Sequence, residues 1–296
     1  MSPTTRARLQ IHFCVVLWGF TAILGKLITL QALPLVWWRM SLVAGALLVV
    51  KGFWTGLART PPRLVATFAA IGVVVSLHWL TFYGSIKLSN ASVAATCMAF
   101  APVLISFVEP LVTRQPFNSL DVFVGLAVVP GVALVVGGTP AGMRPGIAMG
   151  ALSALLVAVF ASLNKRYIAH GEALAVTGIE MGAGALFLTA LSPLLTPMGG
   201  LLAWPSRDDA LLLAALAMGC TLVPFALALV AQRHLSAFAT SLAVNMEPVY
   251  AILLAIALLG EQRELDVSFY LGGAIILGTV FAHPLLARRQ SHFAHE

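Results

Sequence analysis

The sequence predicts an all-α membrane protein of ten transmembrane helices, arranged as two inverted repeats of five helices each. Three observations support this prediction: a composition suited to lipid, a series of apolar runs about twenty residues long, and similarity between the two halves of the chain. Of the 296 residues, 60% are apolar and only 9% are charged, whereas a soluble domain usually carries about 25% charged residues. We therefore expect the chain to lie in a lipid bilayer.

The apolar runs predict helices rather than a β-barrel. A backbone inside a bilayer must form its hydrogen bonds within helices or within a closed barrel. Barrel strands alternate apolar and polar residues over about ten positions, whereas these runs continue without alternation. Ten runs are bounded by charged residues, proline or glycine. They cover residues 9–30, 34–53, 64–86, 90–112, 119–138, 145–168, 173–195, 209–232, 236–259 and 267–286.

The connections between these runs are short, except for the Pro- and Gly-rich stretch 193–209, and no soluble domain fits between them. The first run, from Leu9 to Leu30, follows two arginines as a signal peptide would. It is too long for the apolar region of such a peptide, and no convincing small-residue cleavage site follows it. We expect it to remain as the first span.

Lysine and arginine are distributed unequally between the two ends of the spans. The end that carries the N-terminus holds eleven (Arg6, Arg8, Lys51, Arg59, Arg63, Arg114, Lys165, Arg166, Arg233, Arg288 and Arg289), and the other end holds four (Lys87, Arg144, Arg207 and Arg263). Because cytoplasmic loops carry the excess of positive charge, we expect both termini in the cytoplasm and a multi-pass protein in the inner (plasma) membrane. The same bias accounts for the net charge of +6 without a nucleic-acid partner.

The three cysteines indicate neither a disulfide framework nor a metal site. Cys14, Cys97 and Cys220 are far apart, and each lies in an apolar run. No C-x-x-C spacing is present, so they are interpreted as small buried residues. We expect no metal and no cofactor. The expected partners are the lipid bilayer, a small-molecule metabolite and protons as a candidate coupling ion, with the protein a monomer or a weak homodimer.

Segments from the two halves of the chain align with each other. KLSNASVAA, which begins at Lys87, aligns with HLSAFATSLA, which begins at His234, at an offset of 147 residues. At the same offset, the Gly-x5-Gly spacing that begins at Gly125 recurs at Gly272. The aligned segments keep the same order in both halves, which indicates an internal duplication.

We therefore divide the chain into residues 1–140 and residues 145–296, each with five predicted spans. Because five is odd, the second half enters the membrane from the opposite side, and the duplication is an inverted repeat. Inverted halves that meet at the membrane midplane can rock about a shared site and open it to each side in turn.

A polar group interrupts the apolar stretch from Leu235 to Glu261. Asn245, Glu247 and Pro248 lie near the middle of this predicted span. An ionisable carboxyl at that depth costs about 2.5–3.5 kcal/mol on insertion scales, so it normally faces protein or a water-filled cavity. Glu247 is therefore a candidate substrate or proton-coupling residue, and the alternative is a carboxyl that only hydrogen-bonds a neighbouring helix.

Proline marks a predicted helix break in both halves. Pro248 cannot donate to the carbonyl of Val244, four residues earlier, and Pro102 leaves the carbonyl of Met98 free in the same way. Two broken helices near the midplane would place backbone acceptors around one cavity. Proline can also kink a membrane helix for purely structural reasons, so each break alone leaves both interpretations open.

The chain resembles the EamA-like branch of the drug/metabolite transporter superfamily over nearly its whole length. The segments that carry the resemblance are Trp18-Gly19, Arg39, HWLTFYGSIKLSNASVA across the third and fourth spans, and LSAFATSLAVNMEPVYAILLAIALLGE in the ninth. The resemblance implies a ten-span permease with a central cavity lined by spans 1, 3, 4, 6, 8 and 9. It leaves the substrate open, because members carry amino acids, nucleotide sugars, sugar phosphates and other metabolites. One departure is that Leu-Gly-Glu261 ends the ninth span, whereas Thr-Arg-Gln115 stands at the matching place after the fourth.

Several residues of these spans are candidate liners of the cavity. The candidates are Trp18, His78, Trp79, Phe82, Met98, Asn164, Asn245 and Glu247. Histidine as a residue type titrates near neutrality, so His78 is a candidate for proton coupling, although a lone intramembrane histidine is often a packing residue. Trp79 and Tyr83 have an alternative place in the outer aromatic belt.

Four further charged residues lie within predicted spans. Glu109 is either a gate residue or a carboxyl that reaches the inner interface. Glu180, beside Gly178-x3-Gly182, is interpreted as a marker of close helix packing. Lys26 and Arg39 are candidates to attract a substrate carboxylate or phosphate, and the alternative is that they extend to the outer headgroups.

The sequence favours a secondary transporter over three other classes of protein. An intramembrane enzyme needs a nucleophile with a base, or a metal cluster, and the spans contain no H-E-x-x-H, paired Asp or G-x-S-x-G motif. The sequence contains no Walker motif, so ATP is not expected to be the energy source. A channel needs rings of charge or carbonyls, and a structural protein needs no inverted repeat with broken helices. We predict alternating-access transport of a small polar or amphipathic metabolite, with export of an amino-acid-like compound favoured; exchange, facilitation, or a structural role without transport remain alternatives.

Overall fold

The described residues of the computed structural model form helices joined by turns and irregular segments, with no strand among them. The structure describes the chain except for residues 1, 115, 118, 233–234, 236–242 and 294–296. The first half contains α1 (Pro3–Leu27), α2 (Ala32–Leu48), α3 (Lys51–Arg59), α4 (Pro62–Leu88), α5 (Ala91–Met98), α6 (Ala101–Thr113) and α7 (Ser119–Gly137). The second half contains α8 (Arg144–Tyr167), α9 (Ala173–Leu191), α10 (Arg207–Ala214), π-helical η5 (Ala215–Leu222), α11 (Val223–Gln232), α13 (Glu247–Leu254), π-helical η6 (Ala255–Leu259) and α14 (Val267–Phe293).

Many of these helices can span a membrane by length and composition. Five segments qualify alone: Pro3–Leu27, Pro62–Leu88, Ala91–Thr113, Ala141–Tyr167 and Ala173–Leu194. The bent pair of α2 and α3 brings the number to six, and Gly125–Gly137, Glu247–Leu259 and Val267–Ala282 are shorter apolar helices. The all-helical, multi-pass membrane fold is therefore confirmed. The described residues do not establish the full count of ten spans, which stays a prediction.

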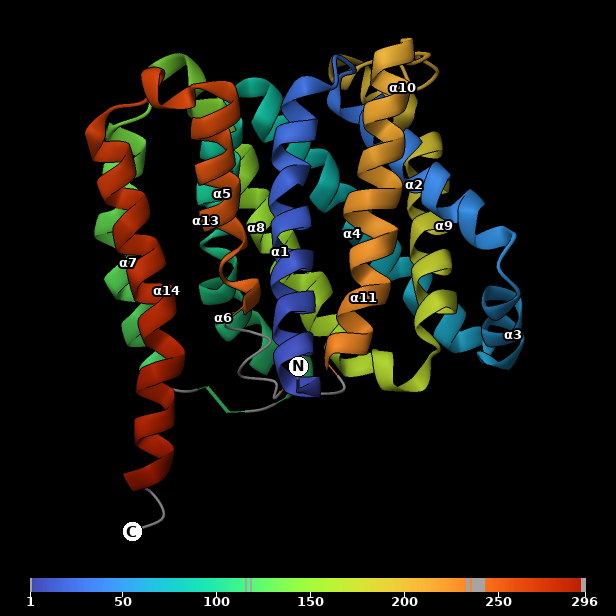
Figure 1. Cartoon of the computed structure of the whole chain (residues 1–296), viewed down its shortest axis with the longest axis horizontal. Helices are drawn as coiled ribbons and strands as arrows, with labels where there is room; N and C mark the ends of the chain where they lie inside the picture. The colour runs from blue at the N-terminus through green and yellow to red at the C-terminus, as the bar shows by residue number, and fades with distance from the viewer. Residues whose placement is uncertain (1, 115, 118, 233–234, 236–242, 294–296) are drawn as a thin grey trace.

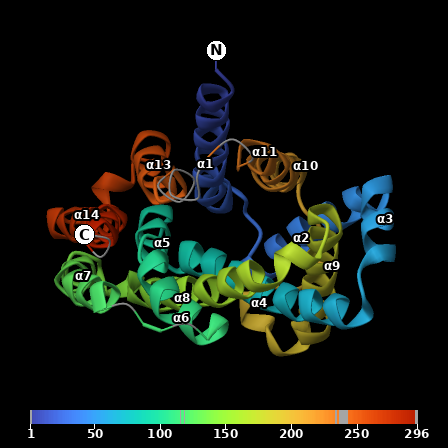
Figure 2. The ribbon, with the colours of Figure 1, turned by 90° about the horizontal axis from the view of Figure 1, so that it is seen from below.

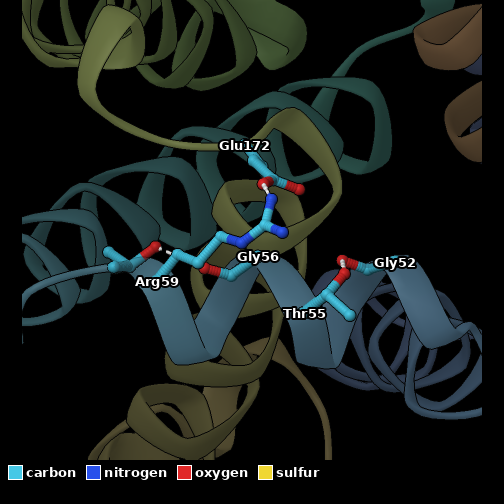
Figure 3. Close-up of polar contacts among 6 residues, drawn as sticks. Gly52, Thr55, Gly56, Arg59 and Glu172 are labelled. Carbon is cyan, nitrogen blue, oxygen red and sulfur yellow. Dashed lines mark hydrogen bonds and ion pairs between the residues drawn. The ribbon is translucent and has the colours of Figure 1, made fainter.

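The second span is shorter than the sequence predicted. It was expected over 34–53, but α2 ends at Leu48 and the chain turns by 89° into α3. The short helix is held in its new direction by contacts with the following elements. Phe53 and Gly56 are buried, and Arg59, three residues after Gly56, forms an ion pair of 2.9 Å with Glu172, just before α9 (Figure 3). Packing against α9 therefore decides where α2 stops.

The helices stand side by side and share one end for both chain termini. Figure 1 shows that α1 begins and α14 ends at this end, which we call the terminal end, and the opposite end is called the far end. In the view from below, the α7–α14 pair lies at one edge of the bundle and α2, α3 and α9 lie at the other (Figure 2). Between them, α1, α4, α5, α8 and α13 occupy the centre (Figure 2).

Close backbone contacts join the two halves of the chain. A Cβ atom added to Gly72 in α4 would lie 2.3 Å from the carbonyl oxygen of Glu180 in α9. One added to Gly272 in α14 would lie 2.5 Å from the carbonyl oxygen of Gly131 in α7. Small residues allow such approaches between membrane helices. The halves therefore pack into one bundle rather than as separate units.

Candidate functional site

A helix break lies inside the fourth predicted span. Here α5 ends at Met98 and α6 begins at Ala101, with a turn between them. Within the turn the N–H of Phe100 donates to the carbonyl of Cys97 at 3.1 Å, and the N–H of Leu104 then donates to the carbonyl of Phe100 at 3.3 Å. The chain thus leaves one helix and starts another within a single span.

The same hydrogen-bond pattern recurs 146 residues later. The N–H of Met246 donates to the carbonyl of Ala243 at 3.0 Å, and the N–H of Tyr250 donates to the carbonyl of Met246 at 3.0 Å. Helix α13 then begins at Glu247. The offset differs by one residue from the 147 found between the aligned sequence segments. The duplication indicated by the sequence is therefore visible in the backbone of the two breaks.

The prolines of the two breaks lie in the first turns of new helices. Pro102 occupies the first turn of α6, and Pro248 occupies the first turn of α13. The missing N–H of proline has no helical partner at that position, and the fixed φ of proline suits a helix start. Each proline thus starts a helix after a turn, rather than bending a continuous helix.

The two broken spans meet in the centre of the bundle. Both views place α5 beside α13 (Figures 1 and 2). Helix α1 packs against α13 so closely that a Cβ on Gly19 would lie 3.2 Å from the backbone nitrogen of Ala251. Asn245 and Glu247 are half-buried at the second break, and neither side chain has a hydrogen-bond partner among the described residues. A carboxyl group is thus available beside the place where the halves meet.

His78, Phe82 and Met98 gather around Ser153 of α8. The Oγ of Ser153 lies 2.8 Å from His78 Nδ1 and 3.7 Å from Met98 Sδ, and it donates to the His78 carbonyl at 3.1 Å. Since that hydroxyl hydrogen is used, the arrangement fits an Nδ1–H that donates to Ser153 Oγ. The rings of Phe82 and Phe160 lie 6.2 and 5.3 Å from the His78 ring, between centroids. His78 is therefore packed and hydrogen-bonded between α4 and α8.

Trp79 lies in a different cluster, centred on Arg39 of α2. The guanidinium of Arg39 stacks on the Trp79 ring at 3.7 Å and donates from Nη1 to Tyr83 Oη at 2.7 Å. Its Nε and Nη2 donate to Thr221 Oγ1 in η5 at 3.0 and 2.8 Å. Tyr83 is fully buried, so the alternative place in an aromatic belt is wrong for this residue. The extension of Arg39 to outer headgroups is also wrong, because the side chain is buried.

The remaining candidates lie apart from these clusters. Trp18 packs against a buried cluster whose members include Cys14, Ala228 and Ala243. Asn164 has a buried Oδ1 with no hydrogen-bond partner among the described residues. Glu109 forms an ion pair with Lys165, which joins α6 to α8 at the terminal end. Glu109 lies four residues before the end of α6, and Lys165 lies two residues before the end of α8, so this pair is close to the ends of both helices.

A buried cap at the far end was not found from the sequence. The Glu261 carboxylate, only 1% exposed, accepts hydrogen bonds from the backbone N–H groups of Ala91 at 2.9 Å and Ser92 at 2.7 Å. These N–H groups belong to the first two residues of α5, so a residue of the second half of the chain caps a helix of the first half. Asn90 caps the same helix through Val93 N and donates to Glu264 at 3.0 Å. An asparagine before an apolar run is a known N-cap signal, and it could have predicted part of this cap.

Thr221 and Ser153 were also missed, since single hydroxyl groups in apolar runs give no signal of their own.

The cap also gives Leu-Gly-Glu261 a structural role. Gln115, its counterpart in the first half, lies outside the described residues. Among those described, no three His, Cys, Asp or Glu side chains are grouped so as to hold a metal ion.

Comparisons with known proteins bear on the whole chain. A family model described as "EamA-like transporter family" matches residues 7–137 and 144–282. No curated protein matches the sequence. A solved structure described as "Crystal structure of protein" is 19% identical to this chain, with a TM-score of 0.63 over 97% of this chain and 99% of its own. At that identity the likeness shows a shared fold.

Proposed function

Because the chain belongs to the EamA-like transporter family, we propose that it moves a small polar or amphipathic metabolite across the inner membrane by alternating access. Family membership confirms the resemblance expected from the sequence. The observation that carries the proposal further is the pair of helix breaks with one hydrogen-bond pattern, 146 residues apart. Broken helices that meet near the middle of inverted repeats are the usual substrate sites of secondary transporters.

Contacts between the halves at both ends of the bundle support a rocking motion about this site. At the far end, Glu261 caps α5 through Ala91 and Ser92. At the terminal end, Lys165 pairs with Glu109, and Arg166 Nη1 donates to the Val112 carbonyl at 2.6 Å. Both sets consist of polar contacts that can separate and form again. Alternating access requires one such set to open while the other stays closed.

Glu247 is the residue that we propose for proton coupling. Its carboxyl is half-buried beside the second break, where gain and loss of a proton would change the charge at the meeting point of the halves. His78 stays a second candidate, although its Nδ1 is engaged by Ser153. We further propose that both termini are cytoplasmic, from the distribution of Lys and Arg, and that export of an amino-acid-like metabolite is the physiological direction.

Uptake into proteoliposomes that contain the full chain tests the proposed function. A pooled library of amino acids and other metabolites would be offered with and without an imposed pH gradient. Saturable flux that the gradient enhances is the expected result and would identify the substrate class. Saturable flux that ignores the gradient would support exchange or facilitation instead of proton coupling. A complete absence of flux, in liposomes where the protein is shown to be folded, would contradict a transport function.

A further inference from the structure

Arg39 is a buried cation whose direct contacts are all neutral groups. Its side chain is 4% exposed and contacts Trp79, Tyr83 and Thr221, from α4 and η5. The described residues form two ion pairs, Arg59 with Glu172 and Lys165 with Glu109, and neither includes Arg39. An arginine stays protonated in proteins, and a buried charge without a counter-charge is strongly unfavourable. The carboxyl of Glu247 interacts electrostatically with Arg39 but forms no ion pair with it among the described residues, so the guanidinium remains open to an anion from outside the chain.

The hydrogen atoms of this cluster provide donors for such an anion. A guanidinium has five N–H donors, and Arg39 uses three of them on Tyr83 and Thr221. Tyr83 Oη accepts one of these bonds, and its own O–H hydrogen has no acceptor among the described residues. Two N–H groups of Arg39 and one O–H group of Tyr83 thus remain to be satisfied. A carboxylate, which only accepts hydrogen bonds, would satisfy them.

The local structure fixes the orientation of the guanidinium. Thr221 Oγ1 donates its own hydrogen to the carbonyl of Leu216, five residues earlier, at 2.9 Å. This bond is specific to the π-helical turn of η5 and leaves both lone pairs of the oxygen for Arg39. π-helical turns occur frequently at functional sites. Trp79 and Thr221 are only half-buried, so the edges of the cluster border accessible space while Arg39 lies behind them.

We propose that Arg39 and Tyr83, with Arg39 held by Thr221 and Trp79, bind the carboxylate of the transported metabolite. The single charge of Arg39 matches a carboxylate, which carries one negative charge. A phosphate group carries up to two at neutral pH and would need a second cation, whereas the three neighbours of Arg39 are uncharged. This inference rests on the proposed transport function and names the substrate group that the carrier recognises. The alternative is that Arg39 only links α2, α4 and η5.

Flux measurements distinguish these two roles. Amino acids and short monocarboxylic acids would each be offered to proteoliposomes beside the corresponding amide, which lacks the negative charge. We expect the acids to be carried and the amides to be carried poorly. We expect Arg39→Gln to raise the KM for the acids by roughly 10- to 100-fold, the usual effect of losing a charged hydrogen bond, and Arg39→Lys to retain part of the affinity. Equal flux of acids and amides, or an unchanged KM in folded Arg39→Gln, would overturn the site.

Two further variants keep the test interpretable if Arg39→Gln does not fold. Tyr83→Phe keeps the charge and the ring but removes both the unused donor and the oxygen that accepts from Arg39 Nη1. We expect it to raise the KM and to lower the thermal stability, because a buried hydrogen bond to a charged group is lost, while the protein remains folded. Arg59→Gln removes an arginine charge from the exposed ion pair with Glu172, and we expect an unchanged KM. If Arg39→Gln does not fold, the KM of Tyr83→Phe decides: an unchanged value would contradict the proposal.

A binding measurement tests the carboxylate site independently of transport. Because Arg39 stacks on Trp79, a bound carboxylate should change the tryptophan fluorescence of the purified full chain. We expect the same carboxylic acids to produce a saturable change that Trp79→Phe and Arg39→Gln abolish, and glycerol 3-phosphate to produce none at equal concentration. A saturable change lost in Arg39→Gln without any flux would support the site and contradict the transport function. No change with any acid, or a response to glycerol 3-phosphate alone, would overturn the carboxylate site.

Discussion

The carboxylate of Glu261 accepts a hydrogen bond of 2.7 Å from the backbone N–H of Ser92, across the boundary between the two halves of the chain. Its second oxygen accepts from Ala91 at 2.9 Å. The first N–H groups of a helix have no partner within the helix, and the positive end of the helix dipole favours a negative charge there. Glu261 thus stabilises the start of α5 and holds the second half against it.

Removal of this carboxylate should destabilise the protein. Glu261→Ala leaves two buried N–H groups without acceptors, and each hydrogen bond to a charged group contributes about 1.5–3 kcal/mol. We expect a clearly lower midpoint of thermal unfolding in detergent and faster hydrogen exchange at Ala91 and Ser92. Glu172→Ala, at an exposed ion pair, is the control and should change stability by about 1 kcal/mol at most. Equal midpoints for Glu261→Ala and the wild type would refute the stabilising role of the cap.

The contact between α4 and α9 should not tolerate a methyl group at Gly72. The added Cβ would lie 2.3 Å from the Glu180 carbonyl oxygen, so the two backbones would have to move apart. Overpacking of this kind typically costs about 1–3 kcal/mol, and we expect Gly72→Ala to lower the unfolding midpoint. Gly182→Ala lies in the same helix as Glu180 with no atom within 4 Å of the new Cβ. Gly182→Ala should raise the midpoint or leave it unchanged, because alanine favours a helix over glycine by roughly 0.5–1 kcal/mol. A higher unfolding midpoint for Gly72→Ala than for Gly182→Ala would show that the close approach is absent.

The hydroxyl of Ser153 should contribute to stability through His78. Ser153→Ala removes the hydroxyl nearest to His78 Nδ1 but keeps the Ser153 carbonyl at 3.2 Å from that nitrogen. We therefore expect a loss of about 0.5–1.5 kcal/mol, the usual net contribution of one hydrogen bond. Thr67→Val removes an exposed hydroxyl that bonds only its own helix and should change stability by about 0.5 kcal/mol or less. Thermal unfolding of the two variants checks this difference. Unfolding at the wild-type temperature in Ser153→Ala would mean that His78 does not depend on this partner.

Glu247→Gln should uncouple transport from the pH gradient. Glutamine keeps the size and the hydrogen-bonding capacity of the side chain but cannot gain or lose a proton. We therefore expect folded protein whose flux no longer responds to an imposed pH gradient. Glu172→Gln removes an exposed carboxyl and should respond as the wild type does. A full gradient response in Glu247→Gln would exclude this residue as the coupling group.

Much of the fold follows from local properties of the sequence. The apolar runs place most of the helices, because a backbone in lipid has few alternatives to a helix. Pro102 and Pro248 indicated the two breaks, since proline has no N–H to donate to the preceding turn and suits the first turn of a new helix. The end of α2 at Leu48 was not predicted, because it depends on packing between α3 and α9 rather than on the apolar run itself. The number of spans is likewise not settled by apolar length alone.

The clusters were harder to predict than the helices. Ser153 joins His78 over 75 positions of sequence, and Thr221 joins Arg39 over 182. Such pairs depend on how the halves cross, which no local pattern in a single sequence encodes. Tyr83 shows the same limit: the sequence left it a place in the outer aromatic belt and gave no sign of its buried arginine partner. The sequence therefore placed the candidate residues on helices but did not identify their neighbours.

Counterflow in proteoliposomes tests alternating access most directly. Vesicles containing the full chain would be loaded with an excess of an unlabelled carried metabolite and then diluted into a trace of the labelled compound, with no pH gradient. An alternating carrier returns to the outside more often with substrate bound, so we expect labelled uptake to rise transiently above its equilibrium level. Labelled uptake that approaches equilibrium without this overshoot, at the same rate in loaded and empty vesicles, would contradict alternating access.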